Sequence, residues 1–123
     1  MQSKEDLISV LSVICEHDKR YKLDAYPFIL GALNFTMQRL KRKGHVSGKE
    51  LSEGIRDYAS SEYGRMAWTV LEHWCIKVTE DFGNIVFNMV DAGVLGKTDE
   101  DNIEDFKDIF DFKAVFEDEY TYE

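Results

Sequence analysis

The stretch GHVSGKELSEGIRDYASSEYGRMAWTVLEHWCIKVTEDFGNIVFNMVDAG, residues 44–93, decides the fold of this chain. It contains three consecutive helix patterns, in which apolar residues recur every three or four positions. Gly64 and Gly93 can adopt the left-handed backbone that ends a helix. We therefore expect three short helices joined by short turns, which form a compact right-angled unit more readily than a long bundle.

The starts of these helices are also visible in the sequence. Ser47 and Glu50 have the spacing of a capping box. Thr79 is expected to cap the third helix, with Glu80 and Asp81 in its first turn, where the helix dipole favours anions. The expected apolar faces are Leu51, Ile55, Tyr58 and Ala59, then Ala67, Val70, Leu71 and Trp74, then Phe82, Ile85, Val86, Met89 and Val90. Trp74, Phe82, Ile85, Val86 and Met89 should form the centre of the core.

Two further helices are expected before this stretch. Residues 4–18 form the first, with Ser3 as its cap, Leu7, Leu11 and Ile14 buried, and Ile8 and Cys15 beside them. The second begins near Pro27, which suits a first helical turn. It should run to about residue 43, stop at Gly44 and bury Phe28, Ala32, Phe35, Met37 and Leu40.

The last thirty residues allow two interpretations. One is an acidic helix over residues 98–108, capped by Asp99, with Ile103, Phe106 and Phe110 inward. The other is a hairpin that pairs residues 94–97 with 109–112 and makes a wing. Residues 111–116 should close the core, and residues 117–123 form an acidic tail. The predicted fold is thus a mainly α-helical single domain over residues 1–123, with helices 3–43 packed on a unit 44–116 that is winged-helix-like over 44–115.

Composition narrows the class of protein. With 123 residues, 44% of them hydrophobic, the chain can bury a real core. No run approaches the roughly 20 apolar residues of a membrane span, and the beginning of the sequence lacks a signal-peptide pattern. Two cysteines 60 residues apart do not make a secreted disulfide framework. We therefore expect a cytoplasmic protein without a membrane partner.

The net charge of −9 is unevenly distributed. Residues 1–49 carry nine Lys or Arg and five Asp or Glu, a net +4, whereas residues 50–123 carry six and nineteen, a net −13. Such poles usually face water or each other, although either one could attract a partner.

The segments GHVSGKEL, GIRDYA and WCIKVTEDFGNIVFNMVDAGVL, with the closing DFKAVF, resemble a family of small bacterial proteins from planctomycetes, verrucomicrobia and deltaproteobacteria. The resemblance covers nearly the whole chain. It implies no activity, cofactor or catalytic residue, because none is assigned to that family. Cys75 stands where the resemblance leads us to expect glycine, so a family-wide role for this cysteine is not implied.

Several motifs invite a chemical interpretation that their spacing does not support. Cys15 with His17, and His73 with Cys75, supply the ligand types of structural zinc, but residues two apart on a helix point about 200° apart. Asp81, Phe82 and Gly83 spell the kinase magnesium motif without the rest of a kinase. The sequence therefore predicts no metal, no cofactor and no catalytic residue.

Nucleic-acid binding is disfavoured by charge. A winged helix would present Glu80, Asn84, Asn88 and Asp91 to the groove, a face without a cation. The candidate anion or partner patch is basic and lies around the end of the second helix: Arg39, Lys41, Arg42, Lys43, His45 and Lys49. The preferred hypothesis is a non-enzymatic protein-interaction or regulatory module, which could form a homo-oligomer. The alternatives are a nucleic-acid binder that uses this patch and an enzyme of an unrecognised type.

Overall fold

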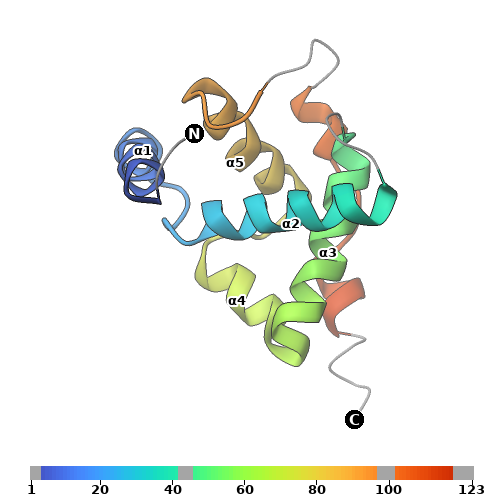
Figure 1. Cartoon of the computed structure of the whole chain (residues 1–123). Helices are drawn as coiled ribbons and strands as arrows, with labels where there is room; N and C mark the ends of the chain where they lie inside the picture. The colour runs from blue at the N-terminus through green and yellow to red at the C-terminus, as the bar shows by residue number, and fades with distance from the viewer. Residues whose placement is uncertain (1–3, 42–45, 97–101, 118–123) are drawn as a thin grey trace.

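The computed structural model describes residues 4–41, 46–96 and 102–117, and within them the chain is helical, with no strand (Figure 1). The elements are α1 (Lys4–His17), α2 (Ala25–Leu40), α3 (Gly48–Tyr63), the 3-10 turn η1 (Gly64–Met66), α4 (Ala67–His73), α5 (Thr79–Asp91), the 3-10 turn η2 (Ile103–Phe106) and the π-type turn η3 (Lys113–Glu117). The expected mainly α-helical fold is confirmed. None of these helices is long and apolar enough to cross a membrane.

The predicted signals at the ends of α3 are confirmed. The Ser47 hydroxyl accepts the Glu50 amide at 3.0 Å, and the Glu50 carboxylate accepts the Ser47 amide at the same distance. Gly64 ends the helix with a φ of 52°, a backbone conformation that glycine adopts without steric cost. Local hydrogen bonding thus fixes where α3 begins and where the chain turns toward α4.

Helices α2 and α3 cross at very short range (Figure 1). A Cβ atom on Gly54 would lie 1.8 Å from the Thr36 hydroxyl oxygen, so no larger residue fits there. Thr36 is itself buried, and its hydroxyl donates to the Ala32 carbonyl at 2.7 Å. The glycine in GIRDYA, Gly54, therefore permits this close contact between α2 and α3.

The core is formed by the inner faces of α1, α2, α3, α4 and α5 and by residues 102–117, which close it. Of the predicted central residues, Phe82, Ile85 and Met89 are fully buried and Trp74 is 8% exposed, whereas Val86 is half-buried at the edge. The buried apolar side chains are Leu11, Ile14, Tyr21, Ala25, Tyr26, Phe28, Ile29, Ala32, Leu51, Ile55, Ala59, Ala67, Leu71, Trp74, Ile76, Phe82, Ile85, Met89, Phe106, Phe112 and Phe116.

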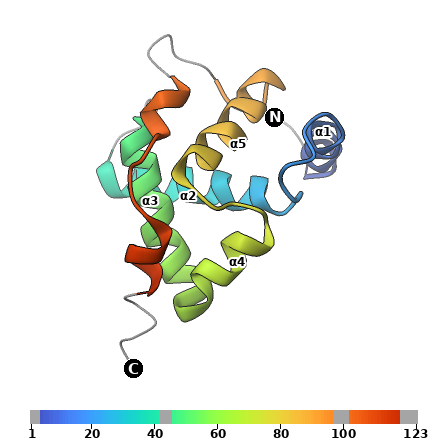
Figure 2. The same ribbon diagram turned by 180° about the vertical axis from the view of Figure 1, so that it is seen from behind.

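Residues 102–117 form a closing segment that runs along α3 (Figure 2). It is held mainly by aromatic side chains: Phe112 stacks on Phe82 with the ring centroids 5.6 Å apart, and Phe116 is 2% exposed. The buried Thr79 hydroxyl donates to the Phe106 carbonyl at 2.5 Å and accepts the Ile109 amide at 3.2 Å. This segment completes the core, as the sequence predicted for residues 111–116.

The predicted cap of α5 is wrong. Thr79 is the first helical residue, and its hydroxyl is used by the closing segment. The Asp81 carboxylate caps the helix instead, because its Oδ2 accepts the backbone amides of Lys77 at 2.8 Å and Val78 at 3.1 Å.

The second helix ends earlier than predicted. Its last residue is Leu40, and Lys41 takes a left-handed conformation with a φ of 57°. Its amide still reaches the Gln38 carbonyl, so the helix stops without glycine. The predicted stop at Gly44 lies outside the described residues, as does the predicted cap Ser3.

The proposed wing is wrong for the part of the chain that the structure describes. Residues 94–96 and 109–112 do not pair as strands. Of the predicted acidic helix, the described residues 102–108 form one helical turn, η2, in which Phe106 is buried but Ile103 is 40% exposed. Asp99 and the rest of the expected helix start lie outside the described residues.

Candidate functional site

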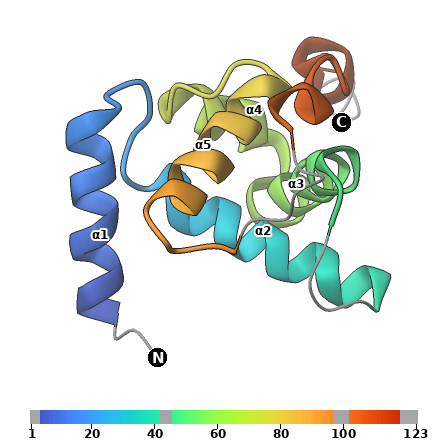
Figure 3. The same cartoon turned by 90° about the horizontal axis from the view of Figure 1, so that it is seen from above.

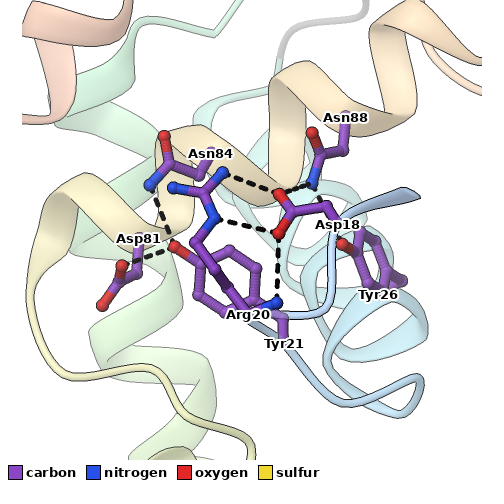
Figure 4. Close-up of polar contacts among 7 residues, drawn as sticks. All are labelled: Asp18, Arg20, Tyr21, Tyr26, Asp81, Asn84 and Asn88. Carbon is purple, nitrogen blue, oxygen red and sulfur yellow. Dashed lines mark hydrogen bonds and ion pairs between the residues drawn. The ribbon is translucent and has the colours of Figure 1, made fainter. Parts of the chain in front are cut away.

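A polar cluster joins the α1–α2 connection to one face of α5 (Figure 4). The Tyr21 hydroxyl donates to Oδ1 of Asp81 at 2.5 Å and accepts the side-chain amide of Asn84 at 2.9 Å. The other oxygen of Asp81 caps α5. One carboxylate therefore binds both the start of α5 and Tyr21 of the α1–α2 connection.

The second half of the cluster is centred on Asp18. The Arg20 guanidinium makes two hydrogen bonds to this carboxylate, at 2.6 Å and 2.9 Å, and its carbon lies 5.2 Å from the Tyr21 ring centroid. One turn along α5 from Asn84, the amide of Asn88 donates to Asp18 at 2.8 Å and to the Tyr26 hydroxyl at 3.1 Å. Two asparagines four residues apart on α5 therefore bind the connection between α1 and α2 at Tyr21 and Asp18.

The electrostatics of the cluster favour a structural role. The hydrogen bonds from Arg20 hold the pKa of Asp18 well below its ordinary value. Burial, and next the hydrogen bond to Asp81, raises the pKa of Tyr21, and burial also raises the pKa of Tyr26. At neutral pH the carboxylate is thus charged and both hydroxyls keep their protons, which suits fixed hydrogen bonds and not acid–base catalysis.

This arrangement corrects the predicted exposed face of α5. Asn84 and Asn88 are half-buried and bonded within the fold, so they do not form a surface that could enter a DNA groove. The sequence signal was the pair of asparagines beside the apolar stripe, four positions apart. Their partners lie more than 60 residues away in the chain, where spacing gives no guide.

The lowered pKa of Asp18 predicts how stability depends on pH. A carboxyl whose pKa is depressed by folding stabilises the native state above the pKa of a free aspartate, about 4, and this contribution is lost as the pH falls through the folded value. Urea titrations between about pH 5 and about pH 2.5 should therefore show a smaller pH-dependent loss for Asp18→Asn than for wild type. The exposed Asp91→Asn variant is the control and should behave as wild type. An equal pH-dependent loss of stability in wild type and Asp18→Asn would show that the lowered pKa does not belong to Asp18.

A second candidate site is a surface pocket at the start of α5, with a volume of about 270 Å³. It lies between the turn that precedes α5 and the closing segment. Three of its side chains are acidic and one is basic, and the apolar part is aromatic on one side. The lining residues are Lys77, Val78, Thr79, Glu80, Asp108, Phe110, Asp111 and Phe112.

We refer to this site as the α5 pocket. Val78 is 49% exposed, Phe110 is half-buried and Phe112 is buried, so apolar surface remains accessible at the rim. Asp108 and Asp111 are exposed, and Asp108 has a φ of 52°, a left-handed conformation that aspartate tolerates better than most residues. None of the pocket residues was predicted as a site.

The predicted basic patch is only partly described. Arg39 forms an ion pair with Asp57 at 2.5 Å across the α2–α3 crossing and lies 5.2 Å from the Phe35 ring centroid. Although burial alone would raise the pKa of Asp57, hydrogen bonds from Arg56 and Arg39 hold it below its ordinary value. Lys41 and Lys49 are exposed, and Arg42, Lys43 and His45 lie outside the described residues.

The two cysteine and histidine pairs are not gathered into one group of possible metal ligands in the part of the chain that the structure describes. Among the described residues, no three His, Cys, Asp or Glu side chains are placed to hold a metal ion. Cys15 and Cys75 are both free, and burial raises the pKa of the Cys15 thiol, which disfavours the nucleophilic thiolate. The motif Asp81, Phe82, Gly83 has a structural explanation in the helix cap, the core and a close contact of Gly83 with Phe106.

Comparison of the chain with protein-family models, curated proteins and solved structures finds no match. The resemblance to a family of small bacterial proteins therefore stays a prediction.

Proposed function

We propose that this chain is a non-enzymatic, cytoplasmic protein-interaction module, and that its α5 pocket binds an arginine-containing segment of a partner protein. The observation that carries the proposal is the composition of the pocket. Glu80, Asp108 and Asp111 surround an aromatic wall, with Lys77 as the single cation in the lining. The lining therefore has a net charge of −2.

Arginine suits this lining for two physical reasons. Its planar guanidinium binds a carboxylate through two parallel hydrogen bonds, and it stacks on aromatic faces more readily than an ammonium group does. Its three-carbon stem can cover exposed apolar surface such as Val78 while the charged group stays near water. The net −13 of residues 50–123 adds a long-range attraction for a basic partner.

The other hypotheses have less support. The α5 face that a DNA-binding helix would use is bonded within the polar cluster. The hypothesis of a nucleic-acid binder relies on the basic patch. One of its described cations, Arg39, is already paired with the Asp57 carboxylate. The pKa values of Tyr21, Tyr26 and Asp18 move away from neutrality, so these three groups are poorly suited to acid–base catalysis at neutral pH. The two free cysteines fit the reducing cytoplasm.

Calorimetric titration with the hexapeptide Gly-Ser-Arg-Leu-Ser-Gly, blocked at both ends, tests the proposal. A single basic side chain in a small pocket should bind weakly, with a Kd on the order of 0.1–1 mM, and more weakly as salt is added. The same peptide with glutamate in place of arginine should not bind, because it would meet like charges.

Matched variants locate the binding. Replacing both Asp108 and Asp111 with asparagine should raise the Kd of the arginine peptide about three- to tenfold, because each exposed ion pair contributes modestly to the binding free energy. Asp91→Asn at the far end of α5 should leave the affinity unchanged. Binding of the glutamate peptide with equal strength, or equal weakening by Asp91→Asn, would contradict a pocket that selects arginine.

A further inference from the structure

The closing segment turns sharply at residues 106–109, next to the first residue of α5. Lys107 has a φ of −77° and a ψ of 130°, and Asp108 has a φ of 52°. These angles approach those of a type II β-turn, in which the third residue has a positive φ and is usually glycine or asparagine. Asp108 therefore occupies a position that favours glycine, and it is also a lining residue of the α5 pocket.

One buried hydroxyl binds both ends of this turn. In an ordinary β-turn the carbonyl of the first residue often accepts the amide of the fourth. Here the Thr79 hydroxyl donates to the Phe106 carbonyl at 2.5 Å and accepts the Ile109 amide at 3.2 Å, so it bridges these same two groups. Thr79 is only 1% exposed, so water has little access to this position. The shape of the turn therefore depends on a side chain of α5.

The first turn of α5 contacts both walls of the α5 pocket. The Asp81 carboxylate accepts the amides of Lys77 and Val78, which line one wall. Helix α5 lies between α1 and the closing segment (Figure 3), so Asp81 reaches the α1–α2 connection at Tyr21, whereas Thr79 reaches the closing segment. The wall that Thr79 binds supplies two of the three pocket carboxylates.

We propose that Thr79 is a positioning residue of the α5 pocket: by bridging the turn, its hydroxyl keeps the Asp108 carboxylate where it binds the arginine of a partner segment. This inference rests on the proposed function, because it concerns the same pocket. Thr79 is buried, so it acts through the turn and not by contact with the arginine. A partner that binds only the bridged turn also stabilises that turn in return.

Amide hydrogen exchange followed by NMR tests the bridge in the full chain. Thr79→Val keeps the shape of the side chain but removes the hydroxyl, so exchange at Ile109 should be about tenfold faster than in wild type. Thr79→Ser keeps the hydroxyl and should exchange as wild type does. In wild type, the arginine hexapeptide at ten times its Kd should slow exchange at Ile109 about tenfold, a result that needs no variant. Circular dichroism checks that both variants keep the fold.

Calorimetric titration with the same peptide tests the positioning role. Thr79→Val should raise the Kd about three- to tenfold, and Thr79→Ser should bind as wild type does. Adding Asp108→Asn to Thr79→Val should raise the Kd little further, because both changes remove the same contact. Wild-type affinity or wild-type exchange at Ile109 in Thr79→Val, or fully additive effects on Kd, would overturn the positioning role alone. Absence of peptide binding by wild type would overturn the proposed function, and this inference with it.

Discussion

Replacing Phe82 with alanine is expected to lower the free energy of unfolding by about 3–5 kcal/mol, as truncation of a buried phenylalanine usually does. Phe82 is fully buried, and its ring lies 5.6 Å from that of Phe112 and 6.1 Å from that of Phe110. The substitution would leave a cavity where α5 meets the closing segment. Urea titration followed by circular dichroism measures the change.

Val86→Ala is the matched control for Phe82→Ala. It lies on the same helix one turn further along, but its side chain is half-buried, so it should cost clearly less. A loss below about 1 kcal/mol for Phe82→Ala would show that the closing segment does not pack on this ring.

Gly54→Ala should destabilise the protein by about 2 kcal/mol or more, although the same change in an ordinary helix stabilises by about 0.5–1 kcal/mol. The added Cβ would lie 1.8 Å from the Thr36 hydroxyl oxygen and 2.9 Å from the Thr36 Cβ. Thr36 is buried in α2 and β-branched, so its side chain has little room to move. The helices would have to separate, and the shift of the thermal unfolding midpoint measures that cost.

Two further variants separate this clash from a general effect of removing glycine. Gly96→Ala adds a Cβ with no atom within 4 Å and should be nearly neutral. Thr36→Ala combined with Gly54→Ala removes the Thr36 hydroxyl and methyl groups, leaves the Thr36 Cβ at 2.9 Å, and should recover part of the stability lost by Gly54→Ala alone. A double variant that is no more stable than Gly54→Ala would show that the α2–α3 contact is not the cause.

Local features of the fold were readable from the sequence because neighbouring residues determine them. The capping box of Ser47 and Glu50, the left-handed Gly64 and the stripe of Phe82, Ile85 and Met89 all depend on spacings of three or four residues. The end of α2 was missed because Lys41 adopts a conformation that glycine usually supplies.

The features that the sequence did not reveal depend on contacts between distant segments. Thr79 was expected to cap its own helix, yet its hydroxyl binds the backbone of Phe106 and Ile109. Asn84 and Asn88 were assigned to an exposed face, because polar residues opposite an apolar stripe usually face water. Their partners on the α1–α2 connection are brought there by the tertiary fold.

The candidate sites show the same limit. The predicted basic patch consists of residues that are close together in the sequence. The sequence did not reveal that one of them, Arg39, forms an ion pair with Asp57 of α3. The α5 pocket combines residues 77–80 with residues 108–112, which are about thirty positions apart in the sequence. The two stretches lie side by side because the closing segment packs against the start of α5. No single stretch of sequence contains enough of the pocket to indicate a site.

Mapping of the arginine hexapeptide onto the chain by two-dimensional amide NMR spectra tests the proposed function most directly. We expect the largest shift changes at the amides of Lys77, Val78, Glu80, Phe110 and Asp111, and we expect no such changes with the glutamate peptide. Changes centred on Lys41 and Lys49, or no change at millimolar peptide, would contradict binding at the α5 pocket.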